Sequence, residues 1–156
     1  MPLLHTTNFG DIEYAASAVF HFPSGLPGFE TERQFVFIEQ PHTDPLMFMH
    51  SLSRADLCFI VLPILVADPH YRLSLTPEDR TELRLPGDLE PRLGEEILCG
   101  ALVCAGSGES GGPTANLLAP IVVNLKEGVG MQVIQTESGY SHQHPLFAQE
   151  ELAPCS

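Results

Sequence analysis

The hydrophobic positions along this chain form short runs that alternate with clusters of proline, glycine and polar residues. Runs of about four to eight residues that are rich in β-branched and aromatic side chains, with such clusters at both ends, are typical of β-strands. The pattern predicts strands at residues 34–38, 46–52, 57–62, 71–75, 95–104 and 131–135, and a weaker strand that ends near residue 22. The chain is therefore expected to be mostly β.

The stretch from Thr114 to Asn124 is central to these predictions. Its Ile121-Val122-Val123 core is β-branched and favours a buried strand. Pro120 can donate no hydrogen bond to a neighbouring strand, so we expect it at the first residue of that strand or on a sheet edge, with a bend before it. Asn116 lies at this bend, where its amide side chain can bond nearby backbone groups that no sheet partner reaches.

Only residues 76–83 carry the signals of a helix start. Thr76 is a preferred N-cap, Pro77 suits the first helical position, and the acidic residues that follow favour the positive end of the helix dipole. Residues 46–52 and 57–62 are spaced as a hairpin, residues 131–135 complete a second hairpin with the central strand, and Gly100 is a candidate β-bulge.

Several short strands, one short helix and no repeated βαβ unit predict an all-β fold. We expect a small single domain over residues 1–156, barrel-like and built of mostly antiparallel strands. Its core is predicted at about residues 11–147, with a flexible tail at residues 148–156. A chain of 156 residues with 44% hydrophobic and 17% charged residues is large enough to bury a core without metal or disulfide support.

Charge narrows the possible partners. Twenty acidic residues against seven basic ones give a formal net charge of -13, which repels nucleic acids and anionic membranes and favours basic protein partners. No apolar run reaches the length of about 18 residues that a membrane span needs, and the first residues do not resemble a secretion signal, so we expect a cytoplasmic protein. Cys58, Cys99 and Cys104 lie in apolar runs and are predicted as core residues in a reducing compartment.

Residues 23–30 combine two prolines and two glycines and predict a tight loop of several turns. Leu26 and Phe29 are apolar residues within this first loop. Apolar side chains in such a loop either pack against the core or are exposed and contact a partner.

Two patterns suggest chemistry, and neither has the context that the chemistry needs. Residues 108–112 match the Gly-x-Ser-x-Gly elbow around Ser110, but an elbow is followed by a helix, whereas Pro113 and a β-branched stretch follow here. His142 and His144 have the spacing of two metal ligands, but the remaining ligands cannot be named, which favours a solvated tail. The sequence therefore predicts no catalytic, cofactor-binding or metal-binding residues and no cofactor.

Two blocks of the chain resemble the flagellar assembly factor FliW family. Residues 22–30 are similar to that family's Phe followed by Gly-Leu-x-Gly-Phe-Glu, and residues 116–124 to its Asn-Leu-x-Ala-Pro-Ile-Val-Ile-Asn. Residues 130–134 follow at the family's spacing, and Tyr140 and His144-Pro145-Leu146 complete the match. The tail departs from the family at Gln143, where arginine is usual.

The resemblance implies a small β-barrel-like domain with a regulatory, non-catalytic role in bacterial flagellum biogenesis. Proteins of this family act as chaperone-like binders of flagellin in the cytoplasm, and they bind the translational repressor CsrA, which relieves the repression of flagellin synthesis. We expect a free monomer whose partner contacts are Leu26, Phe29 and Glu30 in the first loop, Glu32 just after it, and Asn116 in the second block. The alternatives are a small acidic barrel that binds another protein or a small molecule, and a serine hydrolase that uses Ser110.

Overall fold

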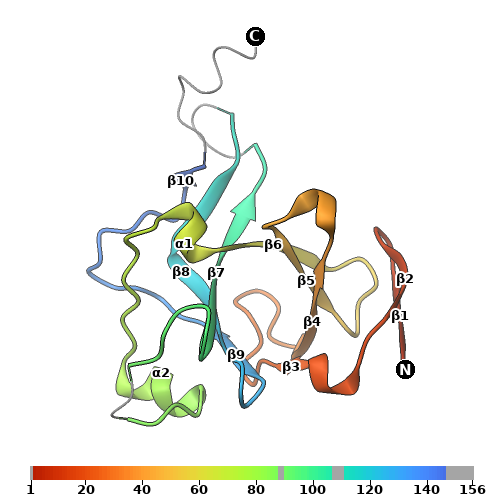
Figure 1. Cartoon of the computed structure of the whole chain (residues 1–156), viewed down its shortest axis with the longest axis horizontal. Helices are drawn as coiled ribbons and strands as arrows, with labels where there is room; N and C mark the ends of the chain where they lie inside the picture. The colour runs from red at the N-terminus through yellow and green to blue at the C-terminus, as the bar shows by residue number, and fades with distance from the viewer. Residues whose placement is uncertain (1, 88–89, 107–110, 147–156) are drawn as a thin grey trace.

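Antiparallel pairing of strands that follow one another in the chain builds most of a barrel (Figure 1). The computed structural model describes residues 2–87, 90–106 and 111–146. The barrel strands are β3 (Phe20–His21), β4 (Gln34–Glu39), β5 (Met47–Ser51), β6 (Cys58–Pro63), β7 (Ile97–Cys104), β8 (Thr114–Asn124) and β9 (Val129–Gln132). Strand β9 closes the ring, because it pairs antiparallel with β8 and parallel with β3. Within the described residues, seven strands therefore form a closed, mostly antiparallel barrel.

Shorter elements surround this barrel. They are the hairpin strands β1 (Leu3–Thr6) and β2 (Gly10–Glu13), the two-residue strand β10 (His144–Pro145) on β8, the helices α1 (Ile64–Ala67) and α2 (Pro77–Glu82), and the 3-10 turns Ala16–Ala18 and Pro41–Thr43. Figure 1 shows the β1–β2 hairpin beside β4 and β5, and the two helices on the opposite side of the barrel, which is the side of β7 and β8.

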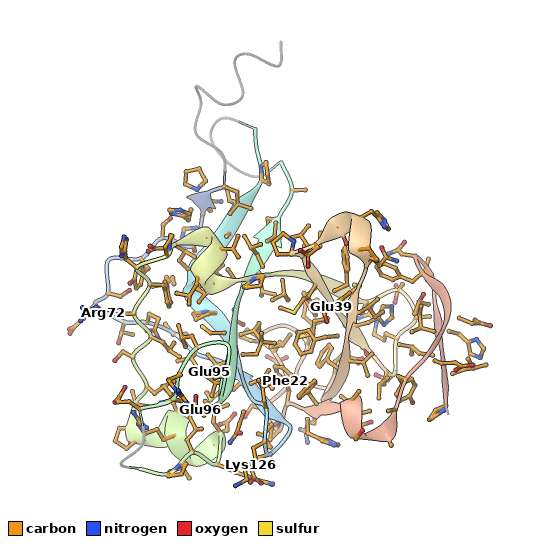
Figure 2. The ribbon with its side chains drawn as sticks, viewed as in Figure 1. Phe22, Glu39, Arg72, Glu95, Glu96 and Lys126 are labelled. Atoms are coloured by element: carbon orange, nitrogen blue, oxygen red, sulfur yellow. The ribbon has the colours of Figure 1, made fainter. Side chains whose placement is uncertain are left out.

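The barrel interior is filled by large apolar side chains. Strands alternate between inward and outward residues, and the inward set forms one cluster. Its buried members are Phe22, Leu26, Phe35, Met47, Met49, Val61, Ile121 and Val123. Phe22 and Phe35 pack edge to face with ring centroids 5.2 Å apart, and Figure 2 shows Phe22 near the middle of the molecule. A barrel filled in this way presents its binding surfaces on the outside.

A second core lies on the outer face of β7 and β8. Its buried members are Ile64, Tyr71, Leu83, Ile97, Cys99, Ala101, Ala115, Leu117, Val122 and Val133. Val122 belongs to this outer core, whereas its neighbours Ile121 and Val123 point into the barrel. Strand β8 is therefore buried on both faces, which explains its continuous β-branched sequence.

The predicted fold class is confirmed, together with most of the predicted elements. Both hairpins are present, a register shift lies between Gly100 and Leu102, and α2 begins with the predicted Thr76 cap. The cap is a capping box, since Asp79 N–H donates to the Thr76 hydroxyl while Asp79 Oδ2 accepts from Thr76 N–H.

Other expectations need correction. A second helix, α1, forms between Pro63 and Asp68, and residues 71–75 join no sheet. Cys104 is exposed at the end of β7, whereas Cys99 is buried and Cys58 half-buried; burial raises the pKa of the Cys58 thiol to about 11. The predicted tail at residues 148–156 lies outside the described residues.

The folded unit also begins earlier than the predicted core boundary at residue 11. Strands β1 and β2 pair over residues 3–13, Leu4 is buried, and Phe9 packs on Phe48 of β5 with ring centroids 5.0 Å apart. The Thr7 N–H donates to the Ala55 carbonyl at 2.8 Å, which ties the hairpin to the β5–β6 turn. The hairpin therefore covers the outer side of β5.

Candidate functional site

The first loop is closed at its base by backbone hydrogen bonds. The Phe22 N–H donates to the Arg33 carbonyl at 2.9 Å, and the Gly25 N–H donates to the Phe22 carbonyl at 2.8 Å. At the tip, the Phe29 N–H donates to the Leu26 carbonyl at 2.7 Å across Pro27 and Gly28. Proline at the second position and a glycine with φ of +86° at the third are the features of a type II turn. The predicted tight loop is thus confirmed.

Gly25 fixes how closely the two sides of this loop approach. Its φ is +63°, and a Cβ atom built there would lie 2.7 Å from the backbone of Glu30. A larger residue at position 25 would push the two sides apart.

The structure places the two apolar residues of the loop against the barrel interior. Leu26 is only 2% exposed and belongs to the interior cluster, and Phe29 is half-buried against the same cluster. The ring of Phe29 packs edge to face on Phe59 with centroids 5.3 Å apart. Leu26 therefore anchors the loop, whereas the open part of Phe29 remains available at the surface.

The two predicted glutamates of this region have different surroundings. Glu30 is exposed, and its carboxylate accepts a hydrogen bond from the Gly28 N–H at 3.0 Å, which lowers the pKa of Glu30. Glu32 is buried, and its Oε1 accepts from the hydroxyls of Ser53 and of Ser51, the latter at 2.7 Å. These two hydroxyls, Ser53 first, lower the pKa of Glu32. Glu30 can meet a partner directly, whereas Glu32 fastens the loop to the β5–β6 turn.

Asn116 organises a bulge in β8. Gly100 pairs with Ile121 and Leu102 pairs with Asn116, so residues 117–120 of β8 oppose a single residue of β7. Within this bulge, Asn116 Oδ1 accepts from the Leu118 N–H at 3.1 Å and from the Ala119 N–H at 3.0 Å. The predicted backbone-bonding role of Asn116 is confirmed, and Pro120 lies in the bulge, inside one long strand rather than at the start of a strand.

The remaining backbone groups of the bulge also have partners. Leu117 N–H donates to the Ser141 carbonyl, and the Tyr71 hydroxyl donates to the Leu117 carbonyl at 2.6 Å. The Leu118 and Pro120 carbonyls accept from the N–H groups of Gln135 and Val133, and the Gln132 side chain donates to the Ala119 carbonyl at 2.9 Å. The bulge is thus a fully bonded structural feature.

A groove of about 250 Å³ lies beside the first loop. It is lined by Ser24, Gly25, Pro27, Glu30, Glu82, Met131 and Gln132. Glu82 of α2 is held in place by the Ser24 hydroxyl, which donates to its Oε2 at 3.1 Å. The groove therefore combines two carboxylates with the apolar surfaces of Pro27 and Met131, a composition that suits a basic or amide-bearing segment of another protein.

Only part of the predicted contact set comes together at this groove. Glu30 lines it, Leu26 and Glu32 support the loop from inside, and Asn116 is connected to it only through the bulge and Gln132. Glu82, Met131 and Gln132 were not predicted. Met131 and Gln132 lie in the third block of the family resemblance and could have been found there, but Glu82 reaches Ser24 across 58 residues and leaves no local signal.

The alternatives that involve chemistry gain no support. Ser110 lies outside the described residues, and the chain continues from Thr114 into strand β8 rather than into a helix. Among residues 2–87, 90–106 and 111–146, no three His, Cys, Asp or Glu side chains gather in a group that could hold a metal ion. Within the same residues, no helix is both long and apolar enough to cross a membrane.

Comparison with known proteins agrees with this architecture. The sequence model of the family described as "FliW protein" matches residues 3–146. The flagellar assembly factor FliW of Desulfitobacterium hafniense strain Y51 is 34% identical over 150 residues, which cover 96% of this chain and 94% of that protein. The flagellar assembly factor FliW of Thermosipho africanus is 30% identical over 142 residues, which cover 91% of this chain and 94% of that protein. A crystal structure of the flagellar assembly factor FliW superposes with a TM-score of 0.80 at 29% identity, covering 94% of this chain and 98% of that one.

Proposed function

The chain belongs to the FliW family, and we propose that it is a non-catalytic regulator of flagellum assembly that binds flagellin and the translational repressor CsrA in the cytoplasm. Binding of CsrA relieves the repression of flagellin synthesis. The two partners together make a switch: while flagellin is abundant it occupies the protein, and when export drains flagellin the freed protein sequesters CsrA.

The observation that carries this proposal is the family match over residues 3–146 to proteins named as flagellar assembly factors. The groove beside the first loop supports it, because the residues of two matched blocks, Glu30 and Gln132, line the same surface. Because Leu26 and Phe22 fill the barrel interior, the groove lies at the outer surface, where a segment of another protein can reach it.

Charge gives independent support for a protein partner of this kind. The formal net charge of -13 raises the rate at which a basic surface is encountered, and Glu30 and Glu82 place carboxylates in the groove itself. An RNA-binding protein such as CsrA offers a basic surface. We therefore assign the acidic groove to protein contacts and expect no direct contact with nucleic acid.

The proposal is tested by capture from the native cytoplasm. The immobilised full chain should retain flagellin and CsrA, identified by mass spectrometry, and each purified partner should raise the melting temperature of the protein by binding its folded state. Retention of neither protein, together with an unchanged melting temperature at partner concentrations well above micromolar, would exclude the proposed function.

A further inference from the structure

The segment from Tyr71 to Leu75 belongs to no sheet, but side chains bond its backbone along one edge as a neighbouring strand would. The Gln135 side chain accepts from the Ser74 N–H at 2.7 Å and donates to the Ser74 carbonyl at 2.8 Å. Two residues earlier, the Arg72 N–H donates to the Tyr140 hydroxyl at 2.9 Å. In an extended chain, the N–H and C=O of one residue point to the same side, and residues two apart share that side. Side chains thus take the place of a neighbouring strand along one edge.

The other edge of this segment is unpaired. Leu73 and Leu75 direct their backbone groups away from the edge that Gln135 and Tyr140 cover. Within the described part of the chain, neither the N–H nor the C=O of these two leucines has a hydrogen-bond partner. Folded proteins usually protect such an edge with a proline, a lysine, a bulge or a covering loop. Residues 71–75 contain neither proline nor lysine.

A groove runs along this segment. It has a volume of about 450 Å³ and is lined by Tyr71 to Leu75, Arg80, Glu90, Pro91 and Leu93. Leu73, Leu75 and Leu93 pack on the outer core, so the groove has a firm apolar base. Arg72 is exposed and has no ion pair among the described residues. Figure 2 shows it at the periphery of the molecule, far from Phe22.

We propose that an extended segment of a partner protein adds to residues 71–75 as a new strand. Its backbone would bond the free N–H and C=O groups of Leu73 and Leu75, its apolar side chains would lie on Leu93 and Pro91, and an acidic side chain would pair with Arg72. Main-chain bonds supply affinity in this mode of recognition, and the side-chain pockets supply specificity. The inference rests on the proposed function, since it describes how one of the two partners is held.

A second copy of this chain is a poor occupant for the edge. Each copy carries a formal net charge of -13, so two copies repel each other. In a symmetric pairing of two such segments, Arg72 of each copy would also find no acidic partner, because residues 71–75 contain no aspartate or glutamate. The occupant that fits is therefore a different protein, with an extended stretch that is apolar at alternate positions and carries at least one acidic residue.

Two substitutions at one position isolate the backbone contribution. Leu73→Pro removes the free N–H and breaks no hydrogen bond of the folded chain, because that N–H has no partner among the described residues. Leu73→Ala is the matched control, since it loses the same leucine packing but keeps the N–H. We expect Leu73→Ala to bind its partner within about threefold of the wild type, and Leu73→Pro to bind at least about tenfold more weakly, as one lost hydrogen bond and a steric block predict.

Hydrogen exchange of the wild-type chain gives a second readout that needs no variant. The amides of Leu73 and Leu75 should exchange rapidly in the free protein and become at least tenfold slower in the complex with flagellin or with CsrA. If neither the flagellin complex nor the CsrA complex protects these amides although a complex forms, or if Leu73→Pro binds both partners as well as Leu73→Ala, the inference is overturned while the proposed function stands. If neither complex forms, both fail. If Leu73→Pro does not fold, the exchange measurement decides.

Discussion

The side-chain amide of Gln135 pairs with both backbone polar groups of Ser74, as a residue of an adjacent strand would. Gln135 is only 2% exposed, whereas Ser74 is exposed, so the pairing ties a buried side chain to a segment at the surface. It couples the chain after β9 to the segment between the two helices, 61 residues earlier. One buried glutamine therefore holds the backbone of Ser74 in place.

Replacing Gln135 by leucine should destabilise the protein strongly. The change leaves the Ser74 N–H and C=O without partners at a half-buried site, and we expect the free energy of unfolding to fall by about 1–3 kcal/mol. Urea denaturation followed by circular dichroism measures the loss. Gln34→Leu is the control, since Gln34 is exposed, and it should change stability by no more than about 0.5 kcal/mol. Equal effects of the two substitutions would show that the pairing contributes nothing.

Asn116→Ala should be costly, and Asn116→Asp should be tolerated. Alanine removes the oxygen that accepts from Leu118 and Ala119, with an expected loss of about 1–3 kcal/mol in the free energy of unfolding. Aspartate keeps an acceptor at the same position and should stay within about 1 kcal/mol of the wild type. If both variants fold normally and lose only partner binding, Asn116 is a contact residue instead of the organiser of the bulge.

Alanine at Gly25 should cost more stability than alanine at Gly28. Both glycines have positive φ, which costs a non-glycine residue on the order of 1 kcal/mol. Only at Gly25 does the added Cβ also meet the Glu30 backbone, at 2.7 Å, whereas the Cβ at Gly28 meets nothing within 4 Å. In thermal unfolding, the melting temperature of Gly25→Ala should therefore be lower than that of Gly28→Ala. The reverse order would contradict the close approach of the two sides of the loop.

Protonation of the Glu32 carboxylate should make the protein less stable in acid. Its pKa is lowered in the folded state from its ordinary value of 4.5, so the stability that it contributes is complete above pH 4.5 and is lost as the pH falls through the lowered value. Glu32→Gln should reduce the urea midpoint at pH 7 and flatten its decline below pH 4.5. Glu30 also has a lowered pKa, so a smaller decline should remain in the variant. An unchanged pH dependence in Glu32→Gln would refute the role of the buried carboxylate.

Local sequence rules predict the elements that local chemistry determines. The Pro27-Gly28 pair specifies its turn, Thr76 and Asp79 specify the start of α2, and the β-branched run at residues 121–123 specifies a strand buried on both faces. Asn116 could be assigned a backbone-bonding role because an amide beside a proline bend has few other uses.

What the sequence does not predict depends on distant partners. Strands β1 and β2 are short and mostly exposed, so they carry little hydrophobic pattern. The contact that places their hairpin is between Phe9 and Phe48 of β5, which are distant in the sequence. Residues 71–75 have the pattern of a strand, but the groups that bond their backbone are the side chains of Gln135 and Tyr140 rather than a neighbouring strand. The groove needs Glu82 to meet Ser24, a contact between segments that no local rule connects.

The central claim is that Glu30 and its groove hold a partner protein, and a calorimetric titration with two charge reversals tests it most directly. Glu30→Lys and Glu39→Lys both change the formal net charge from -13 to -11, and both glutamates are exposed. Glu39 lies on β4 and does not line the groove. Titrated with purified flagellin and with CsrA, Glu30→Lys should bind at least one of them about tenfold more weakly than the wild type, while Glu39→Lys stays within about threefold. Equal losses in the two variants, or no loss in either, would contradict the account.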